Sequence, residues 1–510
     1  MNNLWTQGYF TDLEYVDGYI AEMSPMLLNL NLTLAGIHCG NAHAVAPLRD
    51  LSYLELGFGR GSSLNIHAAS NNGIFYGNDF NPDHTLGAKI FAKASGADVH
   101  LFDTNFADFA SELERRGVSF NIIVLHGVWS WVSVANQRLI LDIIRRFLRV
   151  GGVVYVSYNT FPGWAAKHQL RELLFYYYQS ASGSAERKIV SAVVFLEELL
   201  RKNPSYCTQE ALDFLEELKT KDIAYIAHEY LNRDWNCCYF HQMAHDMAEI
   251  KCDFACSGRI LDHLDVDLMP LNLDSMRHVE DPIFREQLRD YCVNRQFRLD
   301  LFVRGKRKMS LQEGIYKLRN SSFVLTKTPK SFKHTPSKTV NIFDVFIENI
   351  LEFLRADSFR PKNGIEIMEN CQMSFRDFIT CLTVIIHQNL AMPCYPPTES
   401  QKRRTQAFNM FLFDQQTRAR GSIYAASPLT GSGIVVSEAE QVFIIAMLQG
   451  RESFDEILNF AHPIFALQER FVVYHDKAAI NEEENLLYLQ QSLREFLDEK
   501  QYLFRALEVF

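Results

Sequence analysis

Residues 51–70, LSYLELGFGRGSSLNIHAAS, decide the fold. A short β-rich run over 51–55 leads into a loop that contains Gly57, Gly59 and Gly61, and a helical pattern follows over 62–70. Glycine has no Cβ atom, so such a loop can turn sharply and approach a ligand closely. The N-terminus of the following helix offers unsatisfied N–H groups and the positive end of the helix dipole. The stretch therefore predicts a strand, a ligand-binding turn and a helix.

Predicted strands and helices continue to alternate downstream of this stretch. Runs rich in β-branched and aromatic residues predict further strands at 74–79, 99–103, 120–126 and 153–158. Helical patterns between them predict helices at 84–95, 106–116 and 135–148. Strands that alternate with helices form βαβ units, in which a parallel sheet is covered on both faces. We therefore expect an α/β protein, with a Rossmann-like sheet followed by helix-rich domains.

An acidic residue stands at the distance that a nucleoside site requires. Asp79 follows Gly59 by 20 residues, at the end of the second predicted strand, where a carboxylate can accept hydrogen bonds from both ribose hydroxyls. The loop has the spacing G-x-G-x-G, whereas dinucleotide sites have G-x-G-x-x-G. Glu55 precedes the loop. Its side-chain carboxylate can attract the ammonium of a ligand with an amino-acid end, while the loop N–H groups bind the carboxylate of that ligand. The alternative is a tight turn with no ligand.

This pattern resembles motif I of the class I S-adenosylmethionine-dependent methyltransferases. The resemblance implies that Asp79 binds the ribose, that Asp103 binds the adenine amino group and that Phe80 packs against the adenine. Residues 148–152, LRVGG, resemble the turn that leads into the fifth strand of that family. The cofactor-binding residues that we predict for S-adenosylmethionine are Tyr15, Glu55, Gly57, Gly59, Gly61, Asp79, Phe80, Asp103, Thr104 and His126.

Later segments carry the resemblance further. Residues 157–164, 227–249 and 297–307 resemble bacterial methyltransferases with a methyltransferase regulatory domain, and among them the rickettsial protein-lysine methyltransferases that act on outer-membrane proteins. The resemblance implies a protein substrate and a homodimer. It also implies four domains, which are a Rossmann-like catalytic domain at 1–170, a helical regulatory and dimerisation domain at 171–305, a middle domain at 306–400 and a helix-rich domain at 401–510.

Methyl transfer from a sulfonium depends chiefly on orientation, because the leaving group becomes neutral. A lysine amine must also lose its proton, since its reference pKa is about 10.4, and burial beside a cation lowers that pKa. Ligands bind at the carboxyl ends of the strands in such sheets. The catalytic candidates there are His126, Trp129, Tyr158 and Asn159. Trp129 and Trp131 are candidate walls for an aliphatic stem, although ordinary packing is equally expected.

Two other chemistries are disfavoured. After the fourth strand the sequence is His126-Gly127-Val128-Trp129, without the Asn/Asp-Pro-Pro-Tyr/Phe motif of enzymes that methylate base amino groups or glutamine amides. A metal site is the second chemistry considered. Residues of the types that bind zinc recur four apart, as on a helix face, at His241 and His245 and at Cys252 and Cys256. Packing on helices, in a region expected to be predominantly helical, is the preferred interpretation, and no metal is predicted.

Composition bounds the remaining possibilities. The chain has 510 residues, of which 47% are hydrophobic and 22% charged, as in an ordinary globular protein. Its formal net charge of −10 disfavours nucleic acid as a partner. We find no apolar run near the ~18 residues of a spanning helix and no secretory signal. The 10 cysteines are therefore expected to be reduced thiols in the cytoplasm.

The favoured function is a protein-lysine N-methyltransferase for a bacterial outer-membrane or surface protein. One alternative is a small-molecule methyltransferase. Enzymes of that class need only a lid over the cleft. This chain has about 300 residues beyond its catalytic fold, which is enough for two further domains. The other alternative is a catalytically idle scaffold that retains cofactor binding, against which the intact Glu55, Gly57 and Asp79 argue.

Overall fold

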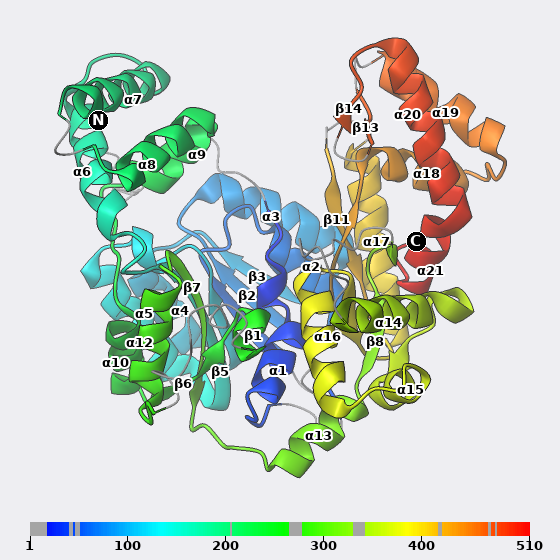
Figure 1. The fold of residues 1–510 in the computed structure, drawn as a ribbon, viewed down its shortest axis with the longest axis horizontal. Coiled ribbons are helices and arrows are strands. Elements are labelled where there is room, and N and C mark those ends of the chain that lie inside the picture. Colours follow the sequence, from blue (N-terminus) through cyan, green and yellow to red (C-terminus); the bar gives the residue numbers. More distant parts are fainter. Residues whose placement is uncertain are drawn as a thin grey trace.

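The computed structural model describes residues 18–39, 44–45, 51–203, 207–264, 278–329, 342–416, 421–467, 471–474 and 477–510. Within these ranges a seven-stranded sheet, formed by strands between residues 51 and 304, has the order β3-β2-β1-β4-β5-β7-β6 (Figure 1). Its strands are β1 (Leu51–Leu56), β2 (Gly73–Asn78), β3 (Val99–Phe102), β4 (Phe120–Leu125), β5 (Leu148–Asn159), β6 (Cys252–Ser257) and β7 (Phe297–Arg304).

The first five strands are parallel, and β7 runs antiparallel to both β5 and β6. The strand order reverses between β1 and β4, which is the switch point where open α/β sheets bind ligands. The predicted α/β fold with a Rossmann-like sheet is thus confirmed. The five predicted strands and four predicted helices of this part are all present.

The expectation of a predominantly helical region around residues 200–300 was wrong for two segments, because 252–257 and 297–304 are strands of the central sheet. Cys252 and Cys256 therefore lie on β6 and not on a helix. In β7 the charged residues Arg298 and Asp300 are buried and bonded to each other. Buried charges conceal the continuous apolar pattern by which a core strand is recognised.

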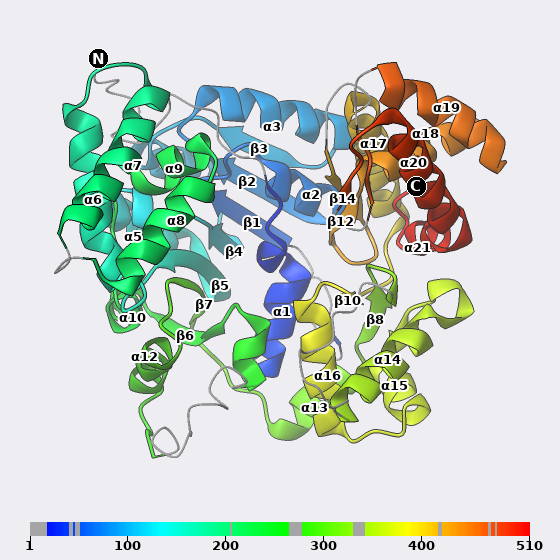
Figure 2. The same cartoon turned by 45° about the horizontal axis from the view of Figure 1, so that its top comes forward.

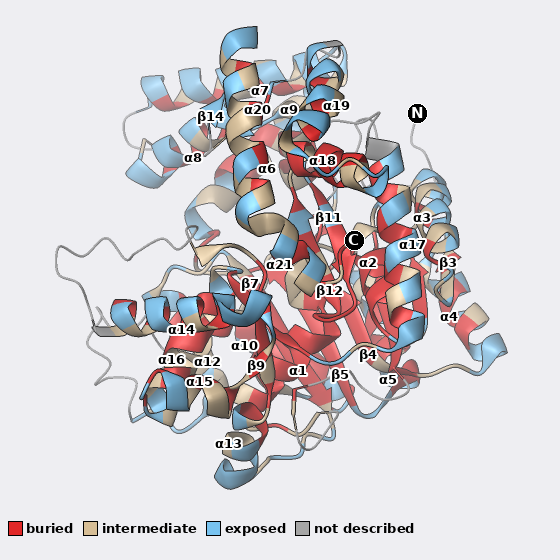
Figure 3. Ribbon diagram, turned by 90° about the vertical axis from the view of Figure 1, so that its right-hand side faces the viewer, coloured by how far each residue is buried: buried red, intermediate tan, exposed pale blue. Residues whose placement is uncertain are grey.

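Helices cover both faces of the sheet (Figure 3). One face packs against α4 (Phe106–Arg116), α5 (Val134–Phe147) and α10 (Phe240–Glu249), and α12 (Pro282–Cys292) packs on α10. The other packs against α1 (Pro25–Leu34), α2 (Ser62–Ser70) and α3 (Pro82–Ser95). Short 3₁₀ helices lie at Ala21–Met23, Trp129–Trp131 and Ile260–Leu264.

A helical layer with its own core follows β5 (Figure 2). It consists of α6 (Ala165–Ser180), α7 (Ala185–Lys202), α8 (Gln209–Thr220) and α9 (Ile223–Tyr230). Trp131 and Trp164 join this core to the end of the sheet. The layer therefore stands over the edge of the sheet where the strands β4 and β5 end.

The rest of the chain surrounds a further core, which also takes in residues of α1 and α2. Its first part has α13 (Leu311–Arg319), β8 (Ser322–Leu325), α14 (Ile342–Phe359), β9 (Lys362–Asn363), α15 (Gly364–Asn370), α16 (Phe375–His387) and β10 (Ala391–Cys394). Its second part has α17 (Glu399–Gln416), β11 (Ile423–Ser427), β12 (Ser432–Val436), α18 (Glu438–Leu448), α19 (Phe454–Leu467), β13 (Val473–Tyr474), β14 (Lys477–Ala478), α20 (Glu482–Glu495), a π-helix (Phe496–Lys500) and α21 (Gln501–Ala506). A capping box formed by Ser437 and Glu440 begins α18.

Helix α2 is buried along its length because the C-terminal region covers the side that the sheet leaves open. All of its residues except Ser62 are buried, and it contacts β11, β12 and α17. The Asn71 amide donates to the Gly431 carbonyl at 2.9 Å, and the Gln401 amide donates to the Ser70 carbonyl at 2.9 Å. In the part of the chain that is described, no helix has both the length and the apolar character to span a membrane.

Candidate functional site

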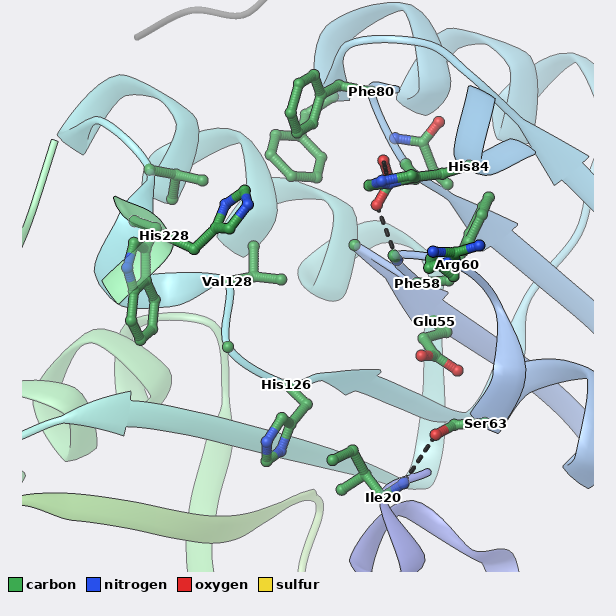
Figure 4. A pocket seen from close by; sticks show the side chains of 18 of the residues that line it. Ile20, Glu55, Phe58, Arg60, Ser63, Phe80, His84, His126, Val128 and His228 are labelled. Atoms are coloured by element: carbon green, nitrogen blue, oxygen red, sulfur yellow. Dashed lines mark hydrogen bonds and ion pairs between the residues drawn. The ribbon is translucent and has the colours of Figure 1, made fainter. Parts of the chain in front are cut away.

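A cavity of about 370 Å³ opens at the carboxyl ends of β1, β2, β3 and β4 (Figure 4). Seven of the residues predicted from the sequence line it, namely Glu55, Gly57, Gly59, Asp79, Phe80, Thr104 and His126. The structure thus brings together residues from four separate strand ends. Tyr15, which was also predicted to bind the cofactor, lies outside the described residues.

The glycine loop has a backbone that other residues adopt only with strain. Gly57, Gly59 and Gly61 have φ angles of 73°, 56° and 82°, in the left-handed region that glycine tolerates. A Cβ atom on Gly57 would lie 2.4 Å from Cγ2 of Val128, and one on Gly61 would lie 2.6 Å from Cβ of Ala88. Gly61 does not line the cavity. It lets α2 begin close against α3, and so it places the helix N-terminus beside the loop.

Asp79 is fixed to the loop by its carboxylate. Oδ2 accepts a hydrogen bond from the Gly59 N–H at 2.9 Å, and Oδ1 accepts one from the Asn81 N–H at 2.9 Å. Nδ1 of His84 lies 3.2 Å from Oδ1. Because a carboxylate oxygen has two lone pairs, Oδ2 keeps acceptor capacity toward the cavity.

Glu55 is the most deeply buried charged group of the cavity wall. Its side chain is 3% exposed, and its Oε2 atom has no hydrogen-bond partner among the described residues. Burial, aided by the nearby Asp79 charge, raises the pKa of the Glu55 carboxyl to about 8. A buried carboxyl without partners is costly, so this position favours a cationic or hydrogen-bond-donating ligand group.

The end of β2 also organises the loop after β3. Oδ1 of Asn78 accepts from the Thr104 hydroxyl at 3.0 Å, and Nδ2 of Asn78 donates to the Thr104 carbonyl at 2.9 Å. These bonds hold Thr104 at the cavity, next to Asn105 and Phe106. Asp103, predicted to bind the adenine amino group, is exposed and does not line the cavity.

His126 lies at the floor of the cavity, as Figure 4 shows. Its Nδ1 atom is 2.8 Å from the hydroxyl of Tyr155. Burial lowers the pKa of the His126 imidazole to about 4, so the ring is neutral near pH 7. A neutral imidazole can orient a ligand by hydrogen bonding, but it does not add a positive charge beside one.

Three predicted catalytic side chains are not brought to this cavity. Trp129 packs into the sheet core, and Tyr158 is fully buried with its hydroxyl donating to Oδ2 of Asp300 at 2.6 Å. The backbone N–H of Asn159 donates to the Ser130 hydroxyl, and the side chain is 3% exposed. Trp131, the second candidate wall, does line the cavity.

Sequence reasoning missed a second wall of the cavity. Tyr225, His228 and Glu229 of α9 line it from the side opposite the glycine loop. His228 and Glu229 fall in the segment 227–249 that carries the regulatory-domain resemblance, but that resemblance assigned them no role at the site. All three residues stand far downstream of the strands whose ends form the other wall. Asn105 and Phe106 were also missed, although their position directly after a parallel strand was a usable signal.

The histidines and cysteines considered for a metal do not gather. His241 and His245 both lie on α10, where Nδ1 of His241 is 3.0 Å from the Gln287 side-chain oxygen and His245 is largely exposed. Cys252 and Cys256 are buried in β6. Among the described residues no group of three or more His, Cys, Asp and Glu side chains is arranged to hold a metal ion.

Comparisons with known proteins agree with this architecture. Residues 222–304 match the family described as a predicted methyltransferase regulatory domain. The chain is 32% identical over 502 residues to protein sll1526 of Synechocystis, with 96% of this chain and 97% of the relative covered. It is 23% identical over 353 residues to protein RP789 of Rickettsia prowazekii, with 68% and 61% covered. The structure of PKMT2 from Rickettsia typhi in complex with AdoHcy is similar, with a TM-score of 0.68, 19% identity, and 96% of this chain and 99% of that chain covered.

The fold and the placement of the cavity define a class, that of proteins with the class I methyltransferase fold extended by a methyltransferase regulatory domain. The resemblance predicted from the sequence is therefore confirmed at the level of fold and domain type. Within that class, the chain belongs to the family of the Synechocystis protein sll1526.

Proposed function

We propose that this protein is an S-adenosylmethionine-dependent methyltransferase whose acceptor is a lysine side chain of a protein. One observation carries the proposal. The strained glycine loop, the carboxyl of Glu55 and the carboxylate of Asp79 meet in a single cavity at the switch point of the sheet. The similarity to PKMT2, which was solved with AdoHcy, supports the same cofactor.

The residues of the cavity fit this cofactor. The carboxyl oxygen of Glu55 that lacks a partner among the described residues suits an ammonium, and the loop leaves no room for a Cβ at Gly57. We infer that Glu55 holds the amino group of the cofactor, that the loop and the start of α2 hold its carboxylate, and that Asp79 holds its ribose. Phe80 and Thr104 then stand on the adenine side.

When bound, S-adenosylmethionine supplies a methyl group activated by a sulfonium. What the chain contributes is position and environment. The glycine loop fixes one end of the ligand, and the neutral His126 ring offers a hydrogen bond at the floor. A fixed mutual geometry of donor and acceptor is the main source of rate in such a displacement.

The proposal that the methyl acceptor is a protein lysine is supported by the extent of the similarity to PKMT2. The likeness to PKMT2 extends over nearly the whole chain and not only over the sheet, in agreement with the resemblance that the sequence shows. We accordingly propose that the acceptor is a bacterial outer-membrane or surface protein, methylated in the cytoplasm by a homodimer. The four-domain division at residues 170, 305 and 400 is part of this proposal. Strands β6 and β7 lie within the second of these ranges but belong to the central sheet.

Calorimetric titration of the full chain with S-adenosylmethionine tests the cofactor, and saturable heat is expected. Incubation with labelled S-adenosylmethionine and bacterial lysate, followed by mass spectrometry, tests the acceptor. Label on lysine side chains of proteins is the expected result. Label confined to metabolites would instead identify a small-molecule methyltransferase, and cofactor binding without any transfer would identify an idle scaffold.

A further inference from the structure

Helix α9 presents one of its faces to the cavity. Tyr225, His228 and Glu229 are spaced by three and four residues, so they share this face. Figure 4 shows His228 directed into the cavity from the side opposite Glu55 and His84. The cofactor contacts inferred above all lie on the far wall. The α9 wall therefore carries none of the inferred cofactor contacts and is available to the methyl acceptor.

The position of α9 is fixed by bonds outside the cavity. Asp222 caps its N-terminus by accepting from the Ala224 N–H at 2.7 Å. The Tyr230 hydroxyl donates to Glu217 at 3.1 Å, and Nε1 of Trp235 donates to the Glu229 carbonyl at 3.0 Å. The backbone of Glu229 is thus held in place by groups that do not involve its carboxyl.

The carboxyl of Glu229 has an unusual environment. Among the residues that the structure describes, no hydrogen-bond or ion-pair partner of this carboxyl is found within bonding distance. Burial raises the pKa of the carboxyl to about 7, and only the more distant charge of Lys221 opposes this effect. The group can therefore both attract a cation and hold a proton near neutral pH.

The surroundings of Glu229 also suit a cation with an apolar stem. Trp131 and Tyr225 also line the cavity, and both pack into the core that α6 to α9 form. Aromatic faces attract ammonium groups. Val128 and Val132 add apolar surface. An acidic acceptor would be repelled both by Glu229 and by the net charge of −10.

We propose that Glu229 is the acceptor-side carboxylate of this cavity, which binds the ammonium of the incoming lysine and takes up its proton. The proton passes from the lysine nitrogen to a carboxylate oxygen of Glu229, and the nitrogen keeps the lone pair that it needs as a nucleophile. Trp131 and Tyr225 contact the lysine stem. This inference rests on the proposed function, and it adds a specificity-determining residue from the regulatory region.

The test compares two capped pentapeptides, Ala-Ala-Lys-Ala-Ala and the same peptide with norleucine in place of lysine. Each is titrated by calorimetry into full-length protein saturated with S-adenosylhomocysteine. The parent protein is expected to bind the lysine peptide about tenfold or more tightly than the norleucine peptide, because hydrogen bonds to charged groups are the strong ones. In Glu229→Gln this preference is expected to vanish, whereas Glu229→Asp should keep part of it.

Glu216→Gln is the matched control, because Glu216 lies on the neighbouring helix α8, is mostly exposed and pairs with Lys219. It should retain the full preference for lysine. All variants should bind S-adenosylhomocysteine with unchanged affinity, which shows that the cavity is intact. A merely structural role for Glu229 would weaken both peptides equally and leave their ratio unchanged.

The outcomes separate the two proposals. If the parent protein binds S-adenosylhomocysteine but binds both peptides equally, or neither at millimolar concentration, the inference about Glu229 is wrong and the proposed cofactor stands. A lysine preference that persists in Glu229→Gln would also show that the inference about Glu229 is wrong, and the proposed cofactor would stand. If the parent protein gives no heat with S-adenosylhomocysteine, the proposed function fails, and the inference fails with it.

Discussion

The carboxylate of Asp79 accepts a hydrogen bond from the backbone N–H of Gly59, with 2.9 Å between Oδ2 and the nitrogen. The end of β2 is thereby tied to the loop that follows β1. The second carboxylate oxygen is held by the Asn81 N–H and lies beside His84. The acid that we assign to the ribose and the loop that we assign to the amino-acid end of the cofactor therefore form one connected unit.

Asp79→Ala is expected to weaken binding of S-adenosylmethionine. It removes one or two charge-assisted hydrogen bonds, each of about 1.5–3 kcal/mol, and it also releases the loop at Gly59. Calorimetric titration measures the loss. Asp83→Ala is the control, because Asp83 is exposed in the first turn of α3. Equal affinity in Asp79→Ala and the parent would show that Asp79 is misassigned.

Gly57→Ala is expected to abolish cofactor binding and to lower stability. The new Cβ would lie 2.4 Å from Val128 Cγ2, at a φ angle of +73° that alanine adopts only with strain. Gly87→Ala is the matched control, since a Cβ there meets no atom within 4 Å and alanine stabilises a helix by roughly 0.8–1 kcal/mol over glycine. Thermal unfolding and calorimetry check both variants. Normal cofactor binding by Gly57→Ala would show that the loop at Gly57 can accommodate a Cβ atom.

Glu55 should give the ligand-free protein a pH-dependent loss of stability. The ordinary pKa is 4.5 and the folded pKa is about 8, so between these values the folded state retains a proton that the unfolded state has lost. Stability therefore falls as pH rises from about 4.5 to about 8, by about 1.4 kcal/mol for each pH unit. Glu55→Gln should remove this slope.

Denaturant titrations at pH 6 and pH 8 measure that slope. Between these pH values the parent protein should lose about 2–3 kcal/mol more of its unfolding free energy than Glu55→Gln does. Other titrating groups contribute equally to both proteins and cancel in the comparison. Parallel pH dependences would mean that the Glu55 carboxyl is ionised in the ligand-free protein.

Tyr158→Phe is expected to lower stability and to leave cofactor affinity unchanged. The hydroxyl donates to the buried Asp300, which is also bonded to Arg298, and its loss should cost about 1.5–3 kcal/mol. Tyr176→Phe, at a largely exposed site on α6, serves as the control. A large fall in kcat with unchanged stability would instead support the catalytic role that the sequence suggested for Tyr158.

Local sequence signals predicted the glycine loop and Asp79, which line one side of the cavity. Glycines at 57, 59 and 61 require a positive φ, and Asp79 follows at a distance set by one βαβ unit. Both features are encoded within thirty or so neighbouring residues, which is the length of such a unit. For the same reason the first four strands and the helices that follow them were predicted to within about two residues. The fifth strand begins five residues before its predicted start, because residues 148–152, which were interpreted as a turn, belong to β5.

The remaining parts depend on contacts between distant residues. Tyr158 stands at a strand end, as the ligand rule requires, but the partner that buries it is Asp300, which is 142 residues away. Glu229 reaches the cavity only because α6 to α9 pack over the sheet edge through their own core. Neither relationship leaves a periodic or short-range pattern in the sequence.

Helix α2 begins at the glycine loop and ends beneath Gly431 and Gln401. Anyone who grafts this catalytic module onto another protein, or trims it to a minimal enzyme, must therefore carry along residues 398–436 or redesign the back of α2. The boundary of the transferable unit is set by what shields that helix from water, and in this chain the shield is encoded more than three hundred residues after the loop it supports.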